Sequence, residues 1–184
     1  REALETEDGH DGNIAIGYRS LRLQDAGSHV YNIGIGYEAG QQNTTGSANL
    51  YLGYKAGEEV TTGSNNVYLG YNAGKGTSSN PTTGSRNIAI GTGSGLVLQG
   101  GAAENILIGA FTGDAIRTGT SNTIIGDNAG SGMTTAAGNV VMGHNALQDG
   151  DCGNNNVVIG NEAGFNASSI TQNVIIGASA GSAA

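Results

Sequence analysis

The sequence predicts an all-β fold: a parallel β-solenoid, or β-roll, of about ten coils with about 17 residues in each. Three observations support this class. A five-residue phrase recurs ten times along the 184 residues. Gly fills 34 positions, too many for a helical domain because each interior Gly destabilises a helix. Aliphatic residues alternate with variable ones inside the phrase, which is the period of a β-strand. We expect a single β-roll repeat domain over residues 1–184.

The repeated phrase consists of Asn, an aliphatic residue, any residue, an aliphatic residue and Gly. Its Asn stands at Asn13, Asn32, Asn49, Asn66, Asn87, Asn105, Asn122, Asn139, Asn156 and Asn173, and its Gly at Gly17, Gly36, Gly53, Gly70, Gly91, Gly109, Gly126, Gly143, Gly160 and Gly177. Successive Gly are 19, 17, 17, 21, 18, 17, 17, 17 and 17 residues apart. The extra residues fall in the connectors, where a solenoid tolerates insertions.

The alternation inside the phrase predicts which side chains fill the coil. The two aliphatic positions, Ile14 and Ile16 in the first copy, share one strand face, and we expect them to point inward. The residue between them then faces outward, and we expect Tyr51 and Tyr68 in this position to pack in an interface. Such short strands need neighbours, so the coils stack at about 4.8 Å per coil.

The Asn and Gly of the phrase fall at the same place in every coil. The stacked Asn side chains are expected to form an amide ladder, each bonded to the Asn above and below. Each Gly marks a point where the backbone turns with positive φ or approaches a neighbouring coil closely. Both columns are therefore predicted to be structural.

The later copies predict self-association. The middle position of the phrase becomes aliphatic in the C-terminal half, at Leu107, Ile124, Val141, Val158 and Ile175. A strand that is apolar on both faces is buried on both faces. One coil has only one interior, so the second face is expected to meet another copy of the chain. The residues alone leave open whether two or three copies assemble.

Several phrases resemble a known family. Residues 13–18 (NIAIGY), residues 65–74 (NNVYLGYNAG) and the TTGS connectors resemble the head repeats of YadA-like trimeric autotransporter adhesins. They are more similar still to related repeats in bacteriophage tail fibres and tailspikes. The resemblance extends from Ala3 to Gly181 and implies a left-handed parallel β-roll, with three chains side by side in a surface-exposed fibre. The adhesin unit is typically shorter than 17 residues, which favours the phage-fibre branch.

The resemblance implies a structural and adhesive role. We expect a shaft or head segment of a homotrimeric, extracellular phage tail fibre that contributes to host attachment through a cell-surface glycan or protein receptor. The alternative is the head of a bacterial trimeric adhesin on the outer surface, binding host matrix or glycan. Ala3-Leu4 matches the ending Ser20-Leu21 of the next coil. We therefore expect a segment of a longer fibre that begins and ends within a repeat.

Four Tyr form the candidate binding surface. Tyr18, Tyr37, Tyr54 and Tyr71 each follow the Gly of the phrase in consecutive copies. Aromatic rings with hydroxyl groups suit contact with sugars, so one interpretation is a glycan-binding strip. The other, which we favour, is that the rings stack on each other and cover coil edges or a seam between chains.

The remaining features argue against an enzyme active site, a cofactor site and a metal site. A net charge of -8 with seven Lys and Arg argues against nucleic acid, and no apolar run is long enough for membrane insertion. The acidic residues are scattered, which disfavours a glycan depolymerase because that reaction uses two facing carboxyl groups. An ice-binding role is disfavoured too, because the Thr lie in turns rather than in strands. We expect Cys152 to be inert.

Overall fold

The fold is an elongated parallel β-solenoid. The structure is a computed structural model and describes residues 2–6 and 12–182. Its ten strands are β1 (Ile14–Ile16), β2 (Ile33–Ile35), β3 (Leu50–Leu52), β4 (Val67–Leu69), β5 (Ile88–Ile90), β6 (Ile106–Ile108), β7 (Thr123–Ile125), β8 (Val140–Met142), β9 (Val157–Ile159) and β10 (Val174–Ile176). Each strand therefore occupies the three residues between the Asn and the Gly of a phrase.

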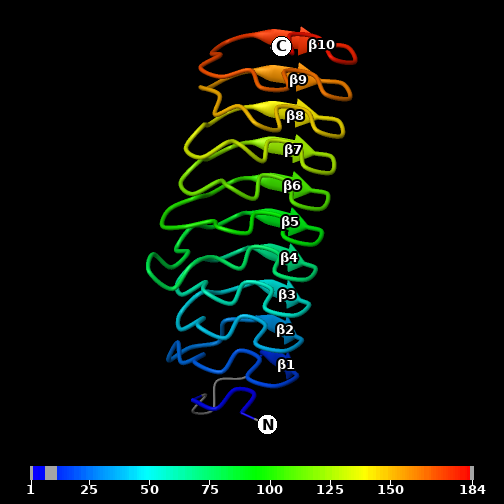
Figure 1. The fold of residues 1–184 in the computed structure, drawn as a ribbon. Coiled ribbons are helices and arrows are strands. Elements are labelled where there is room, and N and C mark those ends of the chain that lie inside the picture. The colour runs from blue at the N-terminus through cyan, green and yellow to red at the C-terminus, as the bar shows by residue number, and fades with distance from the viewer. Residues whose placement is uncertain (1, 7–11, 183–184) are drawn as a thin grey trace.

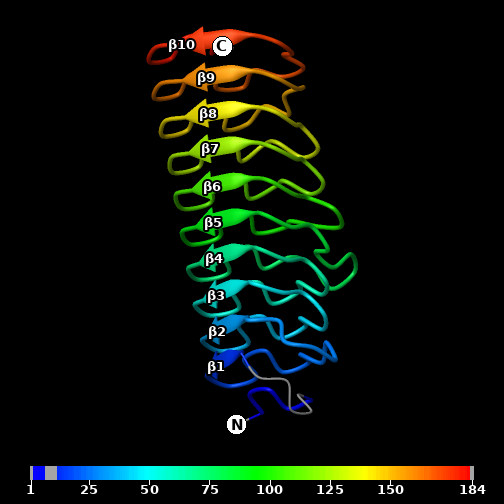
Figure 2. The same ribbon diagram turned by 180° about the vertical axis from the view of Figure 1, so that it is seen from behind.

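The strands form one ten-stranded parallel sheet in sequence order. Each strand pairs with the next at the same position of the phrase, so that Ile14 lies opposite Ile33 and Ala15 opposite Gly34. The strands stack in a single column, and the connectors loop around beside it (Figures 1 and 2). The longest connector, between β4 and β5, bulges from the stack because it holds extra residues. The number and length of the coils are as the repeat predicts.

Residues 2–6 continue the stack below β1. The Leu4 amide donates to the Ser20 carbonyl and the Thr6 amide donates to the Arg22 carbonyl. Leu4 has a φ of 48° and Leu21 one of 46°, so the two occupy equivalent positions. This short segment therefore has the conformation of the corresponding part of a coil.

The core is filled by the middle residue of each strand, so the prediction of which side chains point inward was wrong. Tyr51 and Tyr68 are fully buried rather than packed in an interface. Leu107 and Ile124 are fully buried as well, whereas Ile14 is 49% and Ile16 59% exposed. The aliphatic residues on either side of the middle position therefore face outward along the whole sheet.

The buried Asn column explains this reversal. Asn49 and Asn66 point into the coil and are almost completely buried. Side chains two positions apart in a strand share a face, so the residue two after each Asn also points inward. The first and third residues after the Asn then point outward. Their regular aliphatic character therefore marks an outward-facing surface rather than the core.

The Asn side chains form a continuous amide ladder. The amide Nδ2 of Asn122 donates to Oδ1 of Asn105 at 3.0 Å, and its backbone N–H donates to the same oxygen at 3.2 Å. Its second Nδ2 hydrogen reaches the Ala136 carbonyl at 2.8 Å. The same amide-to-amide bond recurs at Asn49, Asn66, Asn87, Asn105, Asn139 and Asn156. The ladder thus satisfies polar groups that burial would otherwise leave without partners.

The Gly column lies at the opposite end of the strands from the Asn ladder, and there successive coils approach each other closely. Gly36 has a φ of 140°, which side chains disfavour. A Cβ placed on it would lie 2.3 Å from the Gly53 carbonyl oxygen. This position therefore requires Gly both for its backbone conformation and for the space between coils.

Candidate functional surface

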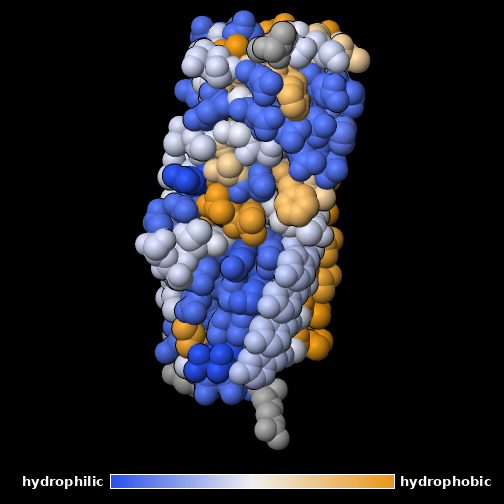
Figure 3. Space-filling view, in the orientation of Figure 1, coloured by the Kyte–Doolittle hydropathy of each residue, from blue (hydrophilic) through white to orange (hydrophobic). Residues whose placement is uncertain are grey.

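The outward aliphatic residues form an exposed face that we call the strip. It consists of the first and third residues of every strand, which are aliphatic except for Thr123 and Met142: Ile14, Ile16, Ile33, Ile35, Leu50, Leu52, Val67, Leu69, Ile88, Ile90, Ile106, Ile108, Thr123, Ile125, Val140, Met142, Val157, Ile159, Val174 and Ile176. Leu52 and Leu69 in the N-terminal half are 36% exposed, and Met142 in the C-terminal half is 37% exposed. Hydrophobic side chains line one edge of the molecule in Figure 3. The strip therefore extends over the full length of the sheet.

The four Tyr that follow the phrase form a second column, the Tyr ladder, next to the strip. The ring centroids of Tyr18 and Tyr37 are 5.1 Å apart, those of Tyr37 and Tyr54 5.2 Å, and those of Tyr54 and Tyr71 5.0 Å. The last pair is tilted by only 8°. The repeat of the coil, which places each ring above the previous one, determines this spacing.

This geometry limits how a sugar could meet the ladder. The rings of Tyr37 and Tyr54 have a neighbouring ring on each face, so a ligand can reach only their edges and hydroxyl groups. Tyr37, Tyr54 and Tyr71 are 40 to 53% exposed. Mutual stacking agrees with our favoured interpretation, while glycan binding by these rings stays a prediction.

Charged residues flank the Tyr ladder in the N-terminal half. Lys55 Nζ lies 2.7 Å from Glu58 Oε1 and 3.1 Å from Glu38 Oε2. Hydrogen bonding to Glu58 is the main reason why the pKa of Lys55 is raised. The Arg19 guanidinium lies 4.9 Å from the Tyr18 ring centroid. The ion pairs made by Lys55 therefore connect neighbouring coils beside the Tyr ladder.

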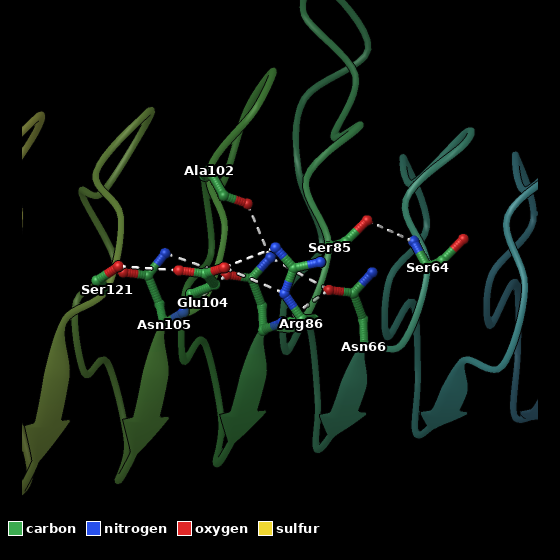
Figure 4. A network of polar contacts seen from close by, with 9 residues as sticks. Ser64, Asn66, Ser85, Arg86, Ala102, Glu104, Asn105 and Ser121 are labelled. Carbon is green, nitrogen blue, oxygen red and sulfur yellow. Dashed lines mark hydrogen bonds and ion pairs between the residues drawn. The ribbon is translucent and has the colours of Figure 1, made fainter.

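The opposite border of the strip carries a polar network, drawn in Figure 4. Arg86 donates to Glu104 Oε1 from Nη2 at 2.6 Å and from Nε at 3.1 Å, and Ser121 donates to Glu104 Oε2 at 3.1 Å. The hydrogen bond from Arg86 is the main cause of the lowered pKa of Glu104. The Ser85 hydroxyl accepts from the Ser64 amide. The strip is thus flanked by exposed polar groups from successive coils.

The described part of the chain contains no cluster of metal-ligating side chains and no exposed thiol. No group of three or more His, Cys, Asp or Glu there could hold a metal ion. Cys152 is buried, and burial raises the pKa of its thiol to about 11, so the thiolate is scarce at neutral pH. Among residues 2–6 and 12–182, no helix meets the length and hydropathy needed to cross a membrane.

Comparison with known proteins identifies no relative. No family model matches the chain, and neither the curated proteins nor the solved structures include a significant match. The strip, the Tyr ladder and the connectors are therefore the structural features from which a function can be inferred. The sequence alone did not predict the strip, because regularly spaced aliphatic residues are equally typical of a strand face in the interior. The buried Asn two positions before the middle residue was the signal that could have revealed it.

Proposed function

We propose that this chain is a structural segment of a homotrimeric surface fibre, in which three copies lie side by side with their strips covered by one another. The observation that carries the proposal is the strip, which places aliphatic side chains from all ten strands on one face. Large contiguous apolar patches on soluble proteins mark interaction sites. A second copy offers the same strip with the same spacing between coils, and is therefore a complementary surface.

The solenoid supports a mechanical role for such an assembly. Each coil contacts its neighbours through the Asn ladder and the sheet, so stiffness extends along the stack. Three copies also present three identical surfaces at one height. Multiplying weak contacts in this way raises the strength of attachment without any tight single site. The resemblance of the repeats supports three copies, and the coil length of about 17 residues supports an extracellular phage tail fibre attaching to a host.

The proposal assigns the segment no catalysis. Several of its acidic side chains are engaged in structural contacts, as Glu38 and Glu58 are with Lys55 and as Glu104 is with Arg86. A glycosidase instead needs two carboxyl groups facing one substrate bond. Hydrolysis of a host polysaccharide by this segment, lost on changing a single acid, would contradict a purely structural and adhesive role.

Charged substitutions in the strip test the self-association. Ile90 and Ile125 face outward and are partly exposed, so the Ile90→Asp, Ile125→Asp variant is expected to fold but to lose assembly. Sedimentation measures the mass, and circular dichroism at matched concentration measures the fold. Thr118→Asp, on an exposed connector, is the control and is expected to assemble as the parent does. An unchanged mass for the strip variant would contradict the proposal.

A further inference from the structure

A groove lies among the connectors that follow β5, β6 and β7, on a part of the coil separate from the strip. It has a volume of about 420 Å³ and is lined by Leu96, Val97, Asp114, Ala115, Arg117 and Ser131. All of these side chains are at least partly exposed. The volume lies at the small end of the range for sites that bind small molecules.

The sequence explains why the surface is hollow here. The fifth and sixth residues after the Gly of the phrase are Leu96 and Val97 in one coil, Asp114 and Ala115 in the next, and Ser131 and Gly132 in the third. Side-chain size thus falls from coil to coil at one position of the repeat. In the N-terminal half the fifth position instead carries the longer side chains of Arg22, Gln41, Glu58 and Lys75. Glu58 and Lys75 are paired to each other. The shorter side chains open the groove.

The groove combines an apolar wall with groups that donate and accept hydrogen bonds. Leu96, Val97 and Ala115 provide aliphatic surface. The Asp114 carboxyl is half-buried, and burial raises its pKa. The exposed Arg117 forms no ion pair with any other described residue. Ser131 already donates to the Gln148 carbonyl at 2.8 Å, which leaves its oxygen able to accept.

We propose that this groove binds a single neutral hexose unit of a glycan. One positive and one negative group line it, so the charges balance and favour an uncharged ligand. A hexose has hydroxyl groups that both donate and accept, which suit Arg117 and Asp114. Its C–H face matches the aliphatic wall of Leu96 and Val97. This inference deepens the attachment role in the proposed function but does not depend on self-association.

A shallow site for one sugar binds weakly. A methyl hexoside is small, and ligands of this size bind with a Kd of about 1 mM when the fit is moderate. When several copies of the chain each bind one sugar unit of the same glycan, the combined attachment is much stronger than one contact alone. The affinity of the single site must therefore be measured with the sugar in large excess.

Backbone NMR of the full chain, titrated with methyl glycosides, tests the proposal. The probes are the methyl glycosides of glucose, galactose and mannose, with methyl glucuronide as an anionic probe and N-acetyl-leucine amide as a peptide-like one. At least one neutral glycoside is expected to cause saturable shift changes centred on residues 96–97, 114–117 and 131. Ala115→Trp fills the groove and is expected to weaken this binding at least 10-fold. Asp114→Ala and Arg117→Ala are each expected to weaken it several-fold.

The control variants make the same kinds of substitution outside the groove. Ala137→Trp puts the same large ring on another connector, while Asp127→Ala and Arg86→Ala remove equivalent charges outside the groove; all three are expected to keep the parent affinity. No response to any neutral glycoside would overturn the proposal, as would unchanged binding by Ala115→Trp or preferential binding of glucuronide or the leucine amide. Sedimentation of Ala115→Trp is expected to match the parent, which separates this result from any failure of self-association.

Discussion

The two halves of the solenoid share one backbone repeat but contain different side chains. Around β3 and β4 the core holds two buried Tyr, and the surface carries the Tyr ladder with its Lys and Glu. Around β6 to β8 the core is Leu107, Ile124 and Val141, and the position of the Tyr ladder holds small or polar residues. The Asn ladder continues through both. The Asn ladder and the Gly column therefore determine the coil, while the core and surface residues vary between the two halves.

The largest expected effect concerns the Asn ladder and tests whether it contributes equally to stability in both halves. Asn66→Leu and Asn122→Leu each leave two donors of the next Asn and one connector carbonyl without their partners. Each is expected to lower the free energy of unfolding by about 5 kcal/mol, because each buried polar group left unsatisfied costs about 1–3 kcal/mol. Urea unfolding measures it. If only one of the two substitutions lowered the free energy of unfolding, the Asn ladder would not be equally important in both halves.

The next prediction concerns the two kinds of core. Tyr68→Ala removes a fully buried ring, whereas Leu107→Ala removes a smaller fully buried side chain. We expect losses of about 4 and about 3 kcal/mol in the free energy of unfolding. A Cβ on Gly74 would lie 2.5 Å from the Tyr68 ring. Gly74→Ala is therefore expected to destabilise the parent more than it destabilises Tyr68→Ala, and equal costs in both backgrounds would contradict this coupling.

Alkaline pH is expected to destabilise the N-terminal half more than the C-terminal half, because two buried Tyr titrate in the first and a single buried thiol, Cys152, titrates in the second. Burial raises the pKa of Tyr51 and Tyr68 above the ordinary value of 10.0. Because the raised pKa favours the neutral phenol in the fold, this stability is complete below pH 10 and is lost as the pH rises above it. Hydrogen exchange of each half, followed as the pH is raised, measures the effect. The double variant Tyr51→Phe, Tyr68→Phe is expected to lose this sensitivity, and uniform loosening of both halves would contradict the prediction.

The Tyr ladder itself is expected to contribute moderately. Tyr54 stacks on Tyr37 and on Tyr71, so Tyr54→Ala removes two ring contacts and is expected to cost about 2 kcal/mol. His144 occupies the same position of the repeat in the C-terminal half and is exposed. His144→Ala is expected to change stability by less than about 0.5 kcal/mol. Equal effects of the two variants in thermal unfolding would remove this difference between the halves.

The smallest expected effect is stabilising. Glu162 and Lys55 occupy the second position after the Gly of the phrase, with φ of 55° and 54°. Gly tolerates this conformation better than any other residue, so Glu162→Gly is expected to raise stability by about 0.5–1 kcal/mol. Lys55→Gly gains the same backbone relief but loses its contacts with Glu38 and Glu58. A smaller or absent gain is expected there, and chemical unfolding of both variants gives the comparison.

The sequence was sufficient to predict the coil, but it did not predict which side chains point into the coil. The recurring Asn and Gly predicted ten strands in register because every coil repeats the same backbone. The direction of the side chains was missed at Ile14 and Tyr51, since regular aliphatic character suits an interface as well as a core. The groove at Leu96 and Arg117 was also missed. It depends on how side chains from three separate coils differ in size, which becomes visible only when the coils are stacked.

The central claim is that the strip is covered by other copies of the chain. Sedimentation equilibrium of the unaltered chain over a wide range of dilution tests it most directly. A species of three times the 18.3 kDa chain mass is expected to persist on dilution. A mass of 18.3 kDa at every concentration would contradict the account.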